Sequence, residues 1–475
     1  MLPPNNDSLT EPLPDIFLRW FARRGWLPRE HQLALLAKAR ADRSALLIAP
    51  TGAGKTLAGF LPTLVELAGG RANGKGLHTL YISPLKALAV DIARNLEAPI
   101  AEMALPIRVE TRTGDTPASR RQRQRRYPPD IMLTTPEQLA LLLASDDAPY
   151  LFASLRRIVL DELHALVTSK RGDLLSLGLS RLWRIAPQVR AIGLSATVAD
   201  PDSLARFLVP QGEDAATKDN NEAAADIVVA GGAAAPVVEM LDTRERLPWA
   251  GHSARHALGE IYDLIKRNKT TLVFVNTRSQ AEMLFQDLWR INDDSLAIAL
   301  HHGSLDVGQR RKVEDAMTAG RLRGVVCTSS LDLGVDWGDV DLVVNVGAPK
   351  GASRLMQRIG RANHRLDEAS RAVLVPANRF EVLECRVAID AVNENAQDTP
   401  PPRSGALDVL AQHVLGCACG APFLADDLYA EVRTAAPYAD LSRADFDDVV
   451  DFVATGGYAL KSYERFARIK QDKQG

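Results

Sequence analysis

The stretch Ala49-Pro50-Thr51-Gly52-Ala53-Gly54-Lys55-Thr56 decides the fold of this 475-residue chain. It follows a short β-rich run, 45–48, and opens an amphipathic stretch, which is the context in which a phosphate-binding loop is meaningful. Glycines let backbone N–H groups turn onto a β-phosphate, Lys55 would reach the β and γ oxygens, and the Thr56 hydroxyl would bind Mg²⁺. Alone, the loop predicts a site for ATP or GTP. The predicted nucleotide ligands are Gly52, Ala53, Gly54, Lys55 and Thr56.

The alternation of strand and helix patterns continues outward from this loop. From Ser44, β-rich apolar runs alternate with amphipathic stretches, the pattern that favours parallel sheets built from β-α-β units. A first series predicts strands at 45–48, 79–82, 131–134, 157–160 and 190–194. A second series predicts strands at 271–275, 296–300, 324–327, 342–346 and 372–375. The predicted fold class is therefore α/β, with two parallel-sheet lobes of similar pattern.

Shifts in composition divide the chain. The stretch 211–236 is rich in small and polar residues and lacks periodicity, so we predict a linker or an exposed insertion. After Thr399-Pro400-Pro401-Pro402, the stretch 407–458 is typical of three short helices followed by a glycine turn, which predicts a small helical winged-helix-like domain. The predicted domains are an N-terminal extension (1–27), an ATP-binding first lobe (28–235), a second lobe (236–400) and a truncated winged-helix-like domain (401–475).

Composition restricts the classes of protein. A chain with 46% hydrophobic and 24% charged residues is ordinary for a globular protein of two to four domains. It has no run of about 18 apolar residues, and 1–11 is polar, so we predict a cytoplasmic protein with no membrane partner. Its four scattered cysteines are predicted to be reduced structural thiols. Because the net charge is only -2, any contact with nucleic acid must be local.

An acidic pair follows the predicted strand 157–160, in the stretch Asp161-Glu162-Leu163-His164. A loop that holds a triphosphate needs one carboxylate for the metal and a second one to activate water. We predict that Asp161 holds Mg²⁺ through its waters and that Glu162 orients and deprotonates the attacking water. Acidic pairs are common at solvated helix starts, but this one stands at a strand end downstream of a phosphate loop.

Two hydroxyls end the next predicted strand, in Ser195-Ala196-Thr197. They are suited to linking the nucleotide site with a nucleic-acid site. A plain helix N-cap is the alternative, since Ser and Thr are preferred there. The spacing leaves both interpretations open.

These residues resemble a known group, the superfamily 2 DExH-box helicases, and within it the large helicase-related (Lhr) family. The resemblance rests on Asp161-Glu162-Leu163-His164, on Ser83-Pro84-Leu85-Lys86-Ala87-Leu88 and on the second-lobe blocks below, and it spans roughly 17–463. The stretches 24–26 and 28–32 look most similar to the bacterial branch linked to DNA ligase and the DNA damage response. Such helicases carry Ala at the first loop position, as Ala49 does here. The resemblance implies two RecA-like motor lobes that use ATP and Mg²⁺.

The resemblance also implies roles in the first lobe. Gln32 would read the adenine edge, since its amide offers both donors and an acceptor; the alternative is a surface glutamine at a helix start. The loops at strand ends would hold the backbone of one nucleic-acid strand without reading its sequence. The implied coupling residues are His164, Ser195 and Thr197. The implied strand contacts of this lobe are Pro84, Lys86, Thr113, Gly114 and Thr135.

In the second lobe, the block Gln357-Arg358-Ile359-Gly360-Arg361 favours a motor over a single-lobe kinase. The resemblance implies that Gln357 and Arg358 face the nucleotide and that Arg361 is the arginine finger; a solvated helix face is the alternative. The final arginine of the family pattern is displaced by one residue, so the role of Arg365 stays open. Asp336 would accept a hydrogen bond from the ribose. The implied strand contacts of this lobe are Thr277, Arg278, Thr328 and Ser329.

A run of arginines within 119–126 has two interpretations, a phosphate-facing helix and an ordinary solvated face, and the sequence favours neither. The run contains Arg120, Arg121, Arg123, Arg125 and Arg126.

The resemblance implies an ATP-dependent helicase or translocase that moves 3′ to 5′ on single-stranded DNA in DNA repair. Its implied partners are single-stranded DNA or an RNA–DNA hybrid, and DNA repair proteins such as a ligase. The alternatives are an RNA or RNA–DNA hybrid helicase and a strand-binding module that does not unwind. In the resembled family further accessory domains follow the winged helix, so a chain that stops at Gly475 is expected to be a shortened form or a core fragment.

Overall fold

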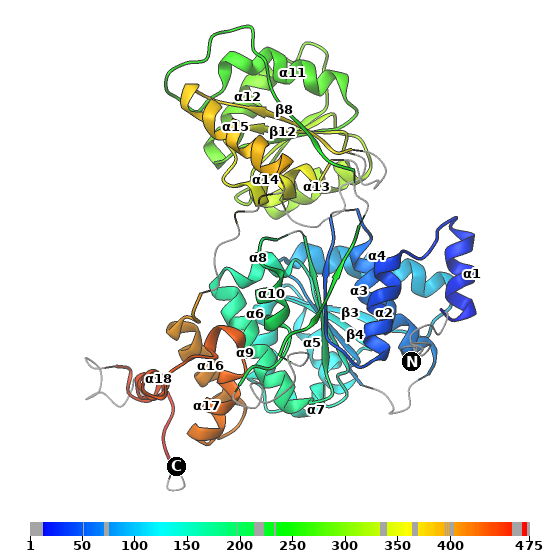
Figure 1. Ribbon diagram of the computed structural model, residues 1–475, viewed down its shortest axis with the longest axis vertical. Coiled ribbons are helices and arrows are strands. Elements are labelled where there is room, and N and C mark those ends of the chain that lie inside the picture. The colour runs from blue at the N-terminus through cyan, green and yellow to red at the C-terminus, as the bar shows by residue number, and fades with distance from the viewer. Residues whose placement is uncertain are drawn as a thin grey trace, which may run out of the picture.

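The chain forms two α/β lobes and a helical C-terminal domain (Figure 1). The computed structural model describes residues 13–50, 52–70, 76–196, 198–212, 223–231, 234–332, 340–362, 369–394, 396, 398, 403–457 and 468–472. The predicted fold class is confirmed: two parallel sheets are followed by a small helical domain.

In the described part of the chain, the first lobe holds a seven-stranded parallel sheet in the order β3-β4-β2-β5-β6-β1-β7. Its strands are β1 (Ala45–Ile48), β2 (Thr79–Ile82), β3 (Val109–Arg112), β4 (Ile131–Thr134), β5 (Arg157–Leu160), β6 (Arg190–Ser195) and β7 (Asp226–Val229). The central strands are buried along their whole length, as expected for a parallel sheet covered on both faces.

Helices cover both faces of this sheet. Because strand residues alternate between faces, Leu46 packs in one apolar cluster with α6–α10, whereas Leu47 packs in another with α1–α4. The helices are α1 (Asp15–Arg23), α2 (Glu30–Arg40), α3 (Lys55–Ala68), α4 (Lys86–Glu102), α5 (Ala118–Arg126), α6 (Pro136–Leu143), α7 (Ala148–Phe152), α8 (Leu163–Val167), α9 (Lys170–Ile185) and α10 (Pro201–Phe207).

The second lobe repeats this plan. Within the described residues its sheet has six parallel strands in the order β10-β11-β9-β12-β13-β8. These are β8 (Val237–Met240), β9 (Thr271–Phe274), β10 (Ile298–His301), β11 (Gly324–Cys327), β12 (Leu342–Val346) and β13 (Arg371–Val375). The lobe also contains η3 (Arg255–Ala257), α11 (Leu258–Arg267), α12 (Arg278–Arg290), α13 (Val307–Thr318), η4 (Ser329–Leu331), α14 (Ala352–Ile359) and α15 (Arg379–Asn393).

The C-terminal helices pack on the first lobe, against α6 and α9 (Figure 1). Leu174 and Leu177 of α9 share an apolar cluster with Leu410 and Val414. An ion pair joins the buried Asp173 of α9 to the exposed Arg403. The domain therefore belongs structurally to the first lobe. It consists of α16 (Leu407–Gly420), α17 (Ala425–Arg433), η5 (Ala436–Tyr438) and α18 (Arg443–Thr455).

The prediction that 211–236 is a linker or insertion is wrong for 226–229, which form β7. This strand pairs with β1, and Asp226 is held by Lys38 at 3.1 Å and by Arg43 at 2.7 Å. Its residues alternate between half-buried and exposed, as expected at the edge of a sheet, so they lack the apolar run that marked the central strands. The strands β3 and β8, which were not predicted, are also outermost in their sheets.

Candidate functional site

The phosphate loop connects β1 to the start of α3. Gly52 and Gly54 have φ of +78° and +74°, in the left-handed region that favours glycine. Helix α3 begins at Lys55, and Thr56 lies in its first turn. Because the first N–H groups of a helix have no partner within it, they are available to bind an anion. Lys55 Nζ donates to the Ala49 carbonyl at 3.1 Å. Its ammonium group therefore lies over the loop, where phosphate oxygens can replace the carbonyl.

The first turn of α2, together with the preceding Arg29, holds the loop from one side. Arg29 donates to the Gly52 carbonyl at 3.1 Å, and His31 Nε2 lies 2.9 Å from the Ala53 carbonyl oxygen. Gln32 is buried and accepts a hydrogen bond from Arg29 N at 3.0 Å. A Cβ built on Gly54 would lie 3.1 Å from Gln32 Nε2. The structure thus places Gln32 against the phosphate loop, with support from two residues that sequence reasoning did not assign.

Asp161 is fixed at the end of β5. Tyr81 donates to Asp161 Oδ2 at 2.6 Å, and the Glu162 N–H donates to Oδ1 at 2.9 Å. Burial, followed by the charge of Glu162, raises the pKa of Asp161 to about 6. Lys55 is the positive charge that acts on Asp161, and burial and Glu162 outweigh it. A carboxylate whose negative charge is only partly compensated is a suitable oxygen donor for Mg²⁺. Tyr81 is a further site residue that the sequence did not reveal, because a tyrosine in an apolar strand resembles core.

Glu162 is the second buried carboxylate, with φ of +48°, a conformation that is rare outside glycine. Burial raises its pKa, but Lys55, with smaller contributions from His164 and Arg361, outweighs burial, so the pKa lies below its ordinary value. Glu162 is therefore ionised at neutral pH, as a general base must be. Arg361 belongs to the second lobe, so this carboxylate is influenced by both lobes.

His164 connects the acidic pair to the end of β6. Its Nδ1 lies 3.1 Å from Ser195 Oγ and accepts the Ala196 N–H at 3.3 Å, while Nε2 lies 3.5 Å from Glu162 Oε2. Burial lowers the pKa of His164, so its ring is neutral at pH 7. Because Nδ1 accepts, the ring proton is assigned to Nε2, facing Glu162. The structure thus brings His164 and Ser195 together; Thr197 lies outside the described residues.

Arg358 corrects a prediction, because it does not face the nucleotide site. Its side chain is 1% exposed; Nε donates to Asp332 Oδ1 at 3.0 Å, and NH1 donates to Asn345. The guanidinium also lies 4.8 Å from the centre of the Phe274 ring. A buried charge that is paired in this way is not available to a second ligand. Arg358 therefore stabilises the packing of the second lobe.

The neighbours of Arg358 lie differently. Gln357 is half-buried on α14, and Arg361 follows the helix as a buried residue whose charge acts on Glu162. The predictions for Asp336 and Arg365 fall outside the described residues.

Two of the predicted strand-contact loops of the first lobe touch one another. Lys86 Nζ lies 3.2 Å from Asp115 Oδ1, and a Cβ on Gly114 would lie 2.9 Å from the same Nζ. Lys86 and Gly114 are exposed, so this pair offers an ammonium group and a bare backbone to a ligand. The buried members of the predicted set are Pro84, Thr113 and Thr135.

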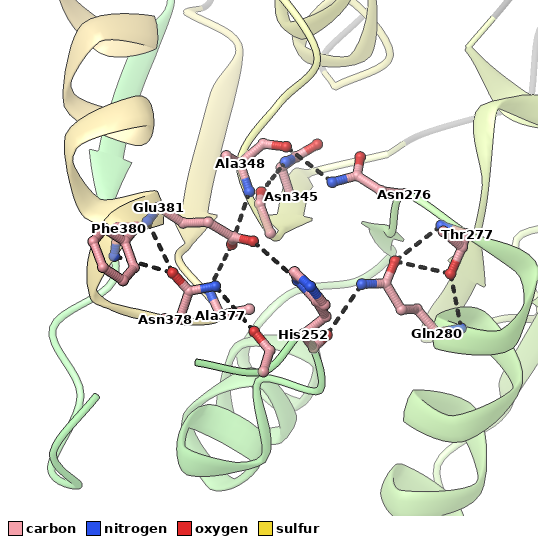
Figure 2. Close-up of polar contacts among 12 residues, drawn as sticks. His252, Asn276, Thr277, Gln280, Asn345, Ala348, Ala377, Asn378, Phe380 and Glu381 are labelled. Carbon is pink, nitrogen blue, oxygen red and sulfur yellow. Dashed lines mark hydrogen bonds and ion pairs between the residues drawn. The ribbon is translucent and has the colours of Figure 1, made fainter. Parts of the chain in front are cut away.

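In the second lobe, the predicted contacts lie where β9 and β11 end. Thr277 is the N-cap of α12 and accepts the Gln280 N–H at 3.2 Å, while the Gln280 side chain accepts the Thr277 N–H at 2.9 Å (Figure 2). Thr277 and Arg278 are exposed. Thr328 is half-buried and Ser329 exposed after β11. Because these strands are parallel neighbours, the two loops share one edge of the sheet.

The arginine run forms α5 and is mostly paired within the protein. Arg120 and Arg123 contact Glu110 at 3.3 and 2.8 Å, and Arg125 contacts Asp147 at 2.8 Å. Arg121 donates to carbonyls of the adjacent loop, including that of Gly114 at 2.7 Å. These contacts favour a helix that supports the strand-contact loop.

In the described part of the chain, one group of side chains has a possible metal-ligand arrangement. Potential ligand atoms of His413, Cys417 and Glu431 lie within 4.8 Å of one another. However, Arg181 and Arg184 donate to Glu431 at 2.9 and 3.1 Å. Two guanidinium groups on the only carboxylate oppose a cation, so we interpret the group as packing between α16, α17 and α9. All four cysteines of the chain are free thiols.

Comparison with known proteins agrees with this geometry. Residues 29–204 match the family model for DEAD/DEAH box helicases, and 254–365 match the helicase conserved C-terminal domain. Residues 390–475 match the winged helix domain of large helicase-related proteins. The chain is also 36% identical over 489 residues to the ATP-dependent helicase Lhr-Core of Methanocaldococcus jannaschii, covering 99% of this chain and 56% of that protein. The chain belongs to the Lhr family of superfamily 2 DExH-box helicases.

A solved Lhr structure extends the likeness to three dimensions. The helicase Lhr of Mycobacterium smegmatis, bound to ssDNA and AMP-PNP, matches with a TM-score of 0.82 and 36% identity, over 93% of this chain and 58% of that chain. The DUF1998 helicase MrfA bound to DNA matches with a TM-score of 0.74 and 24% identity, over 95% of this chain and 62% of that one, which shows the fold alone. The chain spans little more than half the length of the Lhr-Core relative. Among the described residues, no helix combines the length and apolar character needed to cross a membrane.

Proposed function

We propose that this Lhr-family chain is an ATP-driven motor that couples ATP hydrolysis to movement along single-stranded DNA. One observation carries the proposal. Glu162 is influenced by Lys55 of the phosphate loop, by His164 of the coupling segment and by Arg361 of the second lobe. These influences support a role for Glu162 as the group that activates water and that responds to both the phosphate loop and the second lobe. The bound AMP-PNP and ssDNA of the Mycobacterium smegmatis relative support the same ligands here.

The residues divide the work of hydrolysis. The N–H groups of the loop and Lys55 hold the β- and γ-phosphates, and Gln32 contacts the adenine. Thr56, and Asp161 through water, would hold Mg²⁺, which would supply charge neutralisation. Glu162 orients the attacking water and takes its proton.

The second lobe completes the site. Arg361 stabilises charge that develops on the γ-phosphate, so closure of the lobes accompanies ATP binding and opening follows hydrolysis. His164 and Ser195 transmit the state of Glu162 to β6, whose end adjoins the nucleotide site. The exposed contacts Lys86, Arg278 and Ser329 hold the backbone of the strand.

DNA-stimulated ATPase activity tests the motor. We expect stimulation by a single-stranded oligonucleotide that falls to background in Lys55→Ala and Glu162→Gln. Lys266→Ala, which removes an exposed ion pair with Asp294, is the matched control and should hydrolyse ATP normally. ATP hydrolysis that is insensitive to nucleic acid would contradict the proposal.

We propose 3′-to-5′ movement from the family resemblance. Strand displacement from duplexes with 3′ or 5′ tails tests direction and unwinding together. Efficient displacement from the 3′ tail is expected. ATPase activity without displacement would instead favour the alternative of a strand-binding module that does not unwind. Single-stranded RNA of matched length separates the RNA-helicase alternative, because backbone contacts do not identify the sugar.

We also propose a role in DNA repair beside a ligase, supported by resemblance of the segment around Arg24 and Trp26 to the ligase-linked branch. In the fold this segment is structural: the Arg24 guanidinium lies 5.6 and 5.1 Å from the ring centres of Trp20 and Trp26. Deletion of the gene should sensitise cells to DNA damage, with rescue by the wild-type chain and not by Glu162→Gln. Unchanged survival would contradict this role.

A further inference from the structure

The loop between β8 and α11 presents an aromatic ring to solvent. Trp249 is 68% exposed, although tryptophan side chains are highly buried on average. The Arg379 guanidinium lies 4.3 Å from the centre of its ring. Arg379 is also tied to the loop, because its N–H donates to the Pro248 carbonyl at 3.1 Å and its Nε donates to the Leu247 carbonyl at 3.3 Å. The ring and the cation are therefore held as one unit.

This loop is anchored to the edge of the sheet that carries the predicted strand contacts. Asn378 donates to the Gly251 carbonyl at 3.0 Å, and Gln280 donates to the His252 carbonyl at 3.1 Å (Figure 2). Gln280 is the same residue that caps Thr277. A single side chain thus links the Trp249 loop to a predicted phosphate contact.

Glu381 stiffens the same edge. Its Oε2 accepts the N–H groups of Ala348 and Ala377 at 3.1 and 2.9 Å, and its Oε1 lies 3.5 Å from His252 Nδ1 (Figure 2). These backbone groups follow β12 and β13, so one carboxylate joins two strand ends to the loop. A loop braced at this many points holds its aromatic ring in place at little cost in ordering on binding.

The Trp249 ring and the Arg379 guanidinium indicate which kind of ligand this site would bind. A ring stacked with a guanidinium, exposed beside groups predicted to hold phosphates, suits a nucleobase on an anionic backbone. Base stacking needs no sequence-specific hydrogen bonds, which matches a motor that moves along any sequence.

We propose that Trp249, backed by Arg379, is a stacking platform for a base of the single strand at the outer end of its path over the second lobe. The proposal rests on the proposed motor function and adds a contact to the base, where the other predicted contacts hold backbone.

Binding of two probes tests the platform. The probes are a fluorescent single-stranded dT 12-mer and the same sugar-phosphate backbone without bases, both measured by anisotropy with the full chain. Trp249→Ala should weaken binding of the dT probe by about tenfold, within the range for loss of one stacked base. The abasic probe should bind the variant and the wild type equally. Trp249→Phe should restore most of the affinity for dT.

Trp289→Ala is the matched control. Trp289 is 61% exposed in the same lobe. It lies in the last turn of α12, whereas the first residues of that helix adjoin the Trp249 loop. Its loss should leave both affinities unchanged. Unchanged dT binding by Trp249→Ala, or an equal loss on the abasic probe, would overturn the platform alone. Failure of the wild type to bind either probe would instead overturn the proposed function, and the platform with it.

Discussion

Tyr81 donates a 2.6 Å hydrogen bond to Asp161, and this contact partly offsets the burial and the Glu162 charge that raise the pKa of the carboxylate. With a pKa of about 6, Asp161 becomes protonated as the pH falls through 6, and protons then compete with Mg²⁺. The Tyr81 hydrogen bond favours the ionised form. In Tyr81→Phe the pKa rises further, so ATPase activity at limiting Mg²⁺ should be lost at a higher pH than in the wild type. Excess Mg²⁺ should restore it. If the loss of ATPase activity at low pH occurred at the same pH in Tyr81→Phe and in the wild type, this account would be contradicted.

Arg358 and Arg354 both contact Asp332, and they allow a matched comparison of a buried and an exposed charge. The side chain of Arg358 is 1% exposed, while that of Arg354 is 46% exposed and lies 3.7 Å from Asp332. Arg358→Ala leaves the carboxylate buried without its main partner, which costs about 3 to 5 kcal/mol. Arg354→Ala should cost less than about 1 kcal/mol. Urea unfolding of both variants checks this, and equal stability would contradict the packing role of Arg358.

The same residue shows what sequence reasoning could not reach. The resemblance identified the block around Arg361, a buried residue whose charge acts on Glu162. It could not tell which guanidinium of the block turns inward, because the partners of Arg358 are distant in sequence and unremarkable in type. Tyr81 was missed for a related reason: its hydroxyl meets Asp161 only once two strands pair.

At the scale of elements, the sequence predicted the buried strands more accurately than the outer strands. The strands β1, β2, β4 and β5 were predicted at their observed bounds, because strands covered on both faces are continuous apolar runs. The outer strands are less buried: β3 alternates half-buried with buried residues, and β7 and β8 alternate half-buried with exposed residues. The pairing of these strands depends on neighbours far along the chain. Local patterns do not contain that information.

Helix α9 is the element that fixes the C-terminal domain, and Asp173 is its buried contact. Asp173 is 0% exposed, pairs with Arg403 and accepts the Ala406 N–H at 3.2 Å. Asp173→Ala leaves these donors without their acceptor, so the docking of α16 should weaken by about 1 to 3 kcal/mol. Hydrogen exchange of α16 should increase while that of β9–β13 stays unchanged.

Lys170→Ala provides the control for that experiment. It removes the exposed pair between Lys170 and Asp408, which also joins α9 to α16. Exposed pairs contribute little, so exchange of α16 should resemble the wild type. Equal effects of the two variants would show that Asp173 is not the anchor.

At the scale of the whole molecule, the charge of Arg361 in the second lobe acts on Glu162 in the first lobe, and each lobe carries part of the predicted strand contacts. If nucleotide and strand favour the same closed arrangement, each must raise the affinity for the other by an equal factor, because coupling free energies are reciprocal. We expect AMP-PNP to increase affinity for a dT 12-mer by about 5- to 150-fold, and the dT 12-mer to increase affinity for AMP-PNP by the same factor.

Arg361→Ala and Glu162→Gln separate binding from chemistry in this cycle. Arg361→Ala removes the proposed contact between the second lobe and the γ-phosphate, so the coupling factor should fall toward one. The ATPase rate should fall by about 10³-fold or more, the usual worth of an arginine finger. Glu162→Gln keeps the shape of the site while removing the base, so it should retain coupling without hydrolysis. Titration calorimetry with each ligand, in the presence and absence of the other, measures all of these factors. Full coupling in Arg361→Ala would mean that closure is driven by other contacts between the lobes.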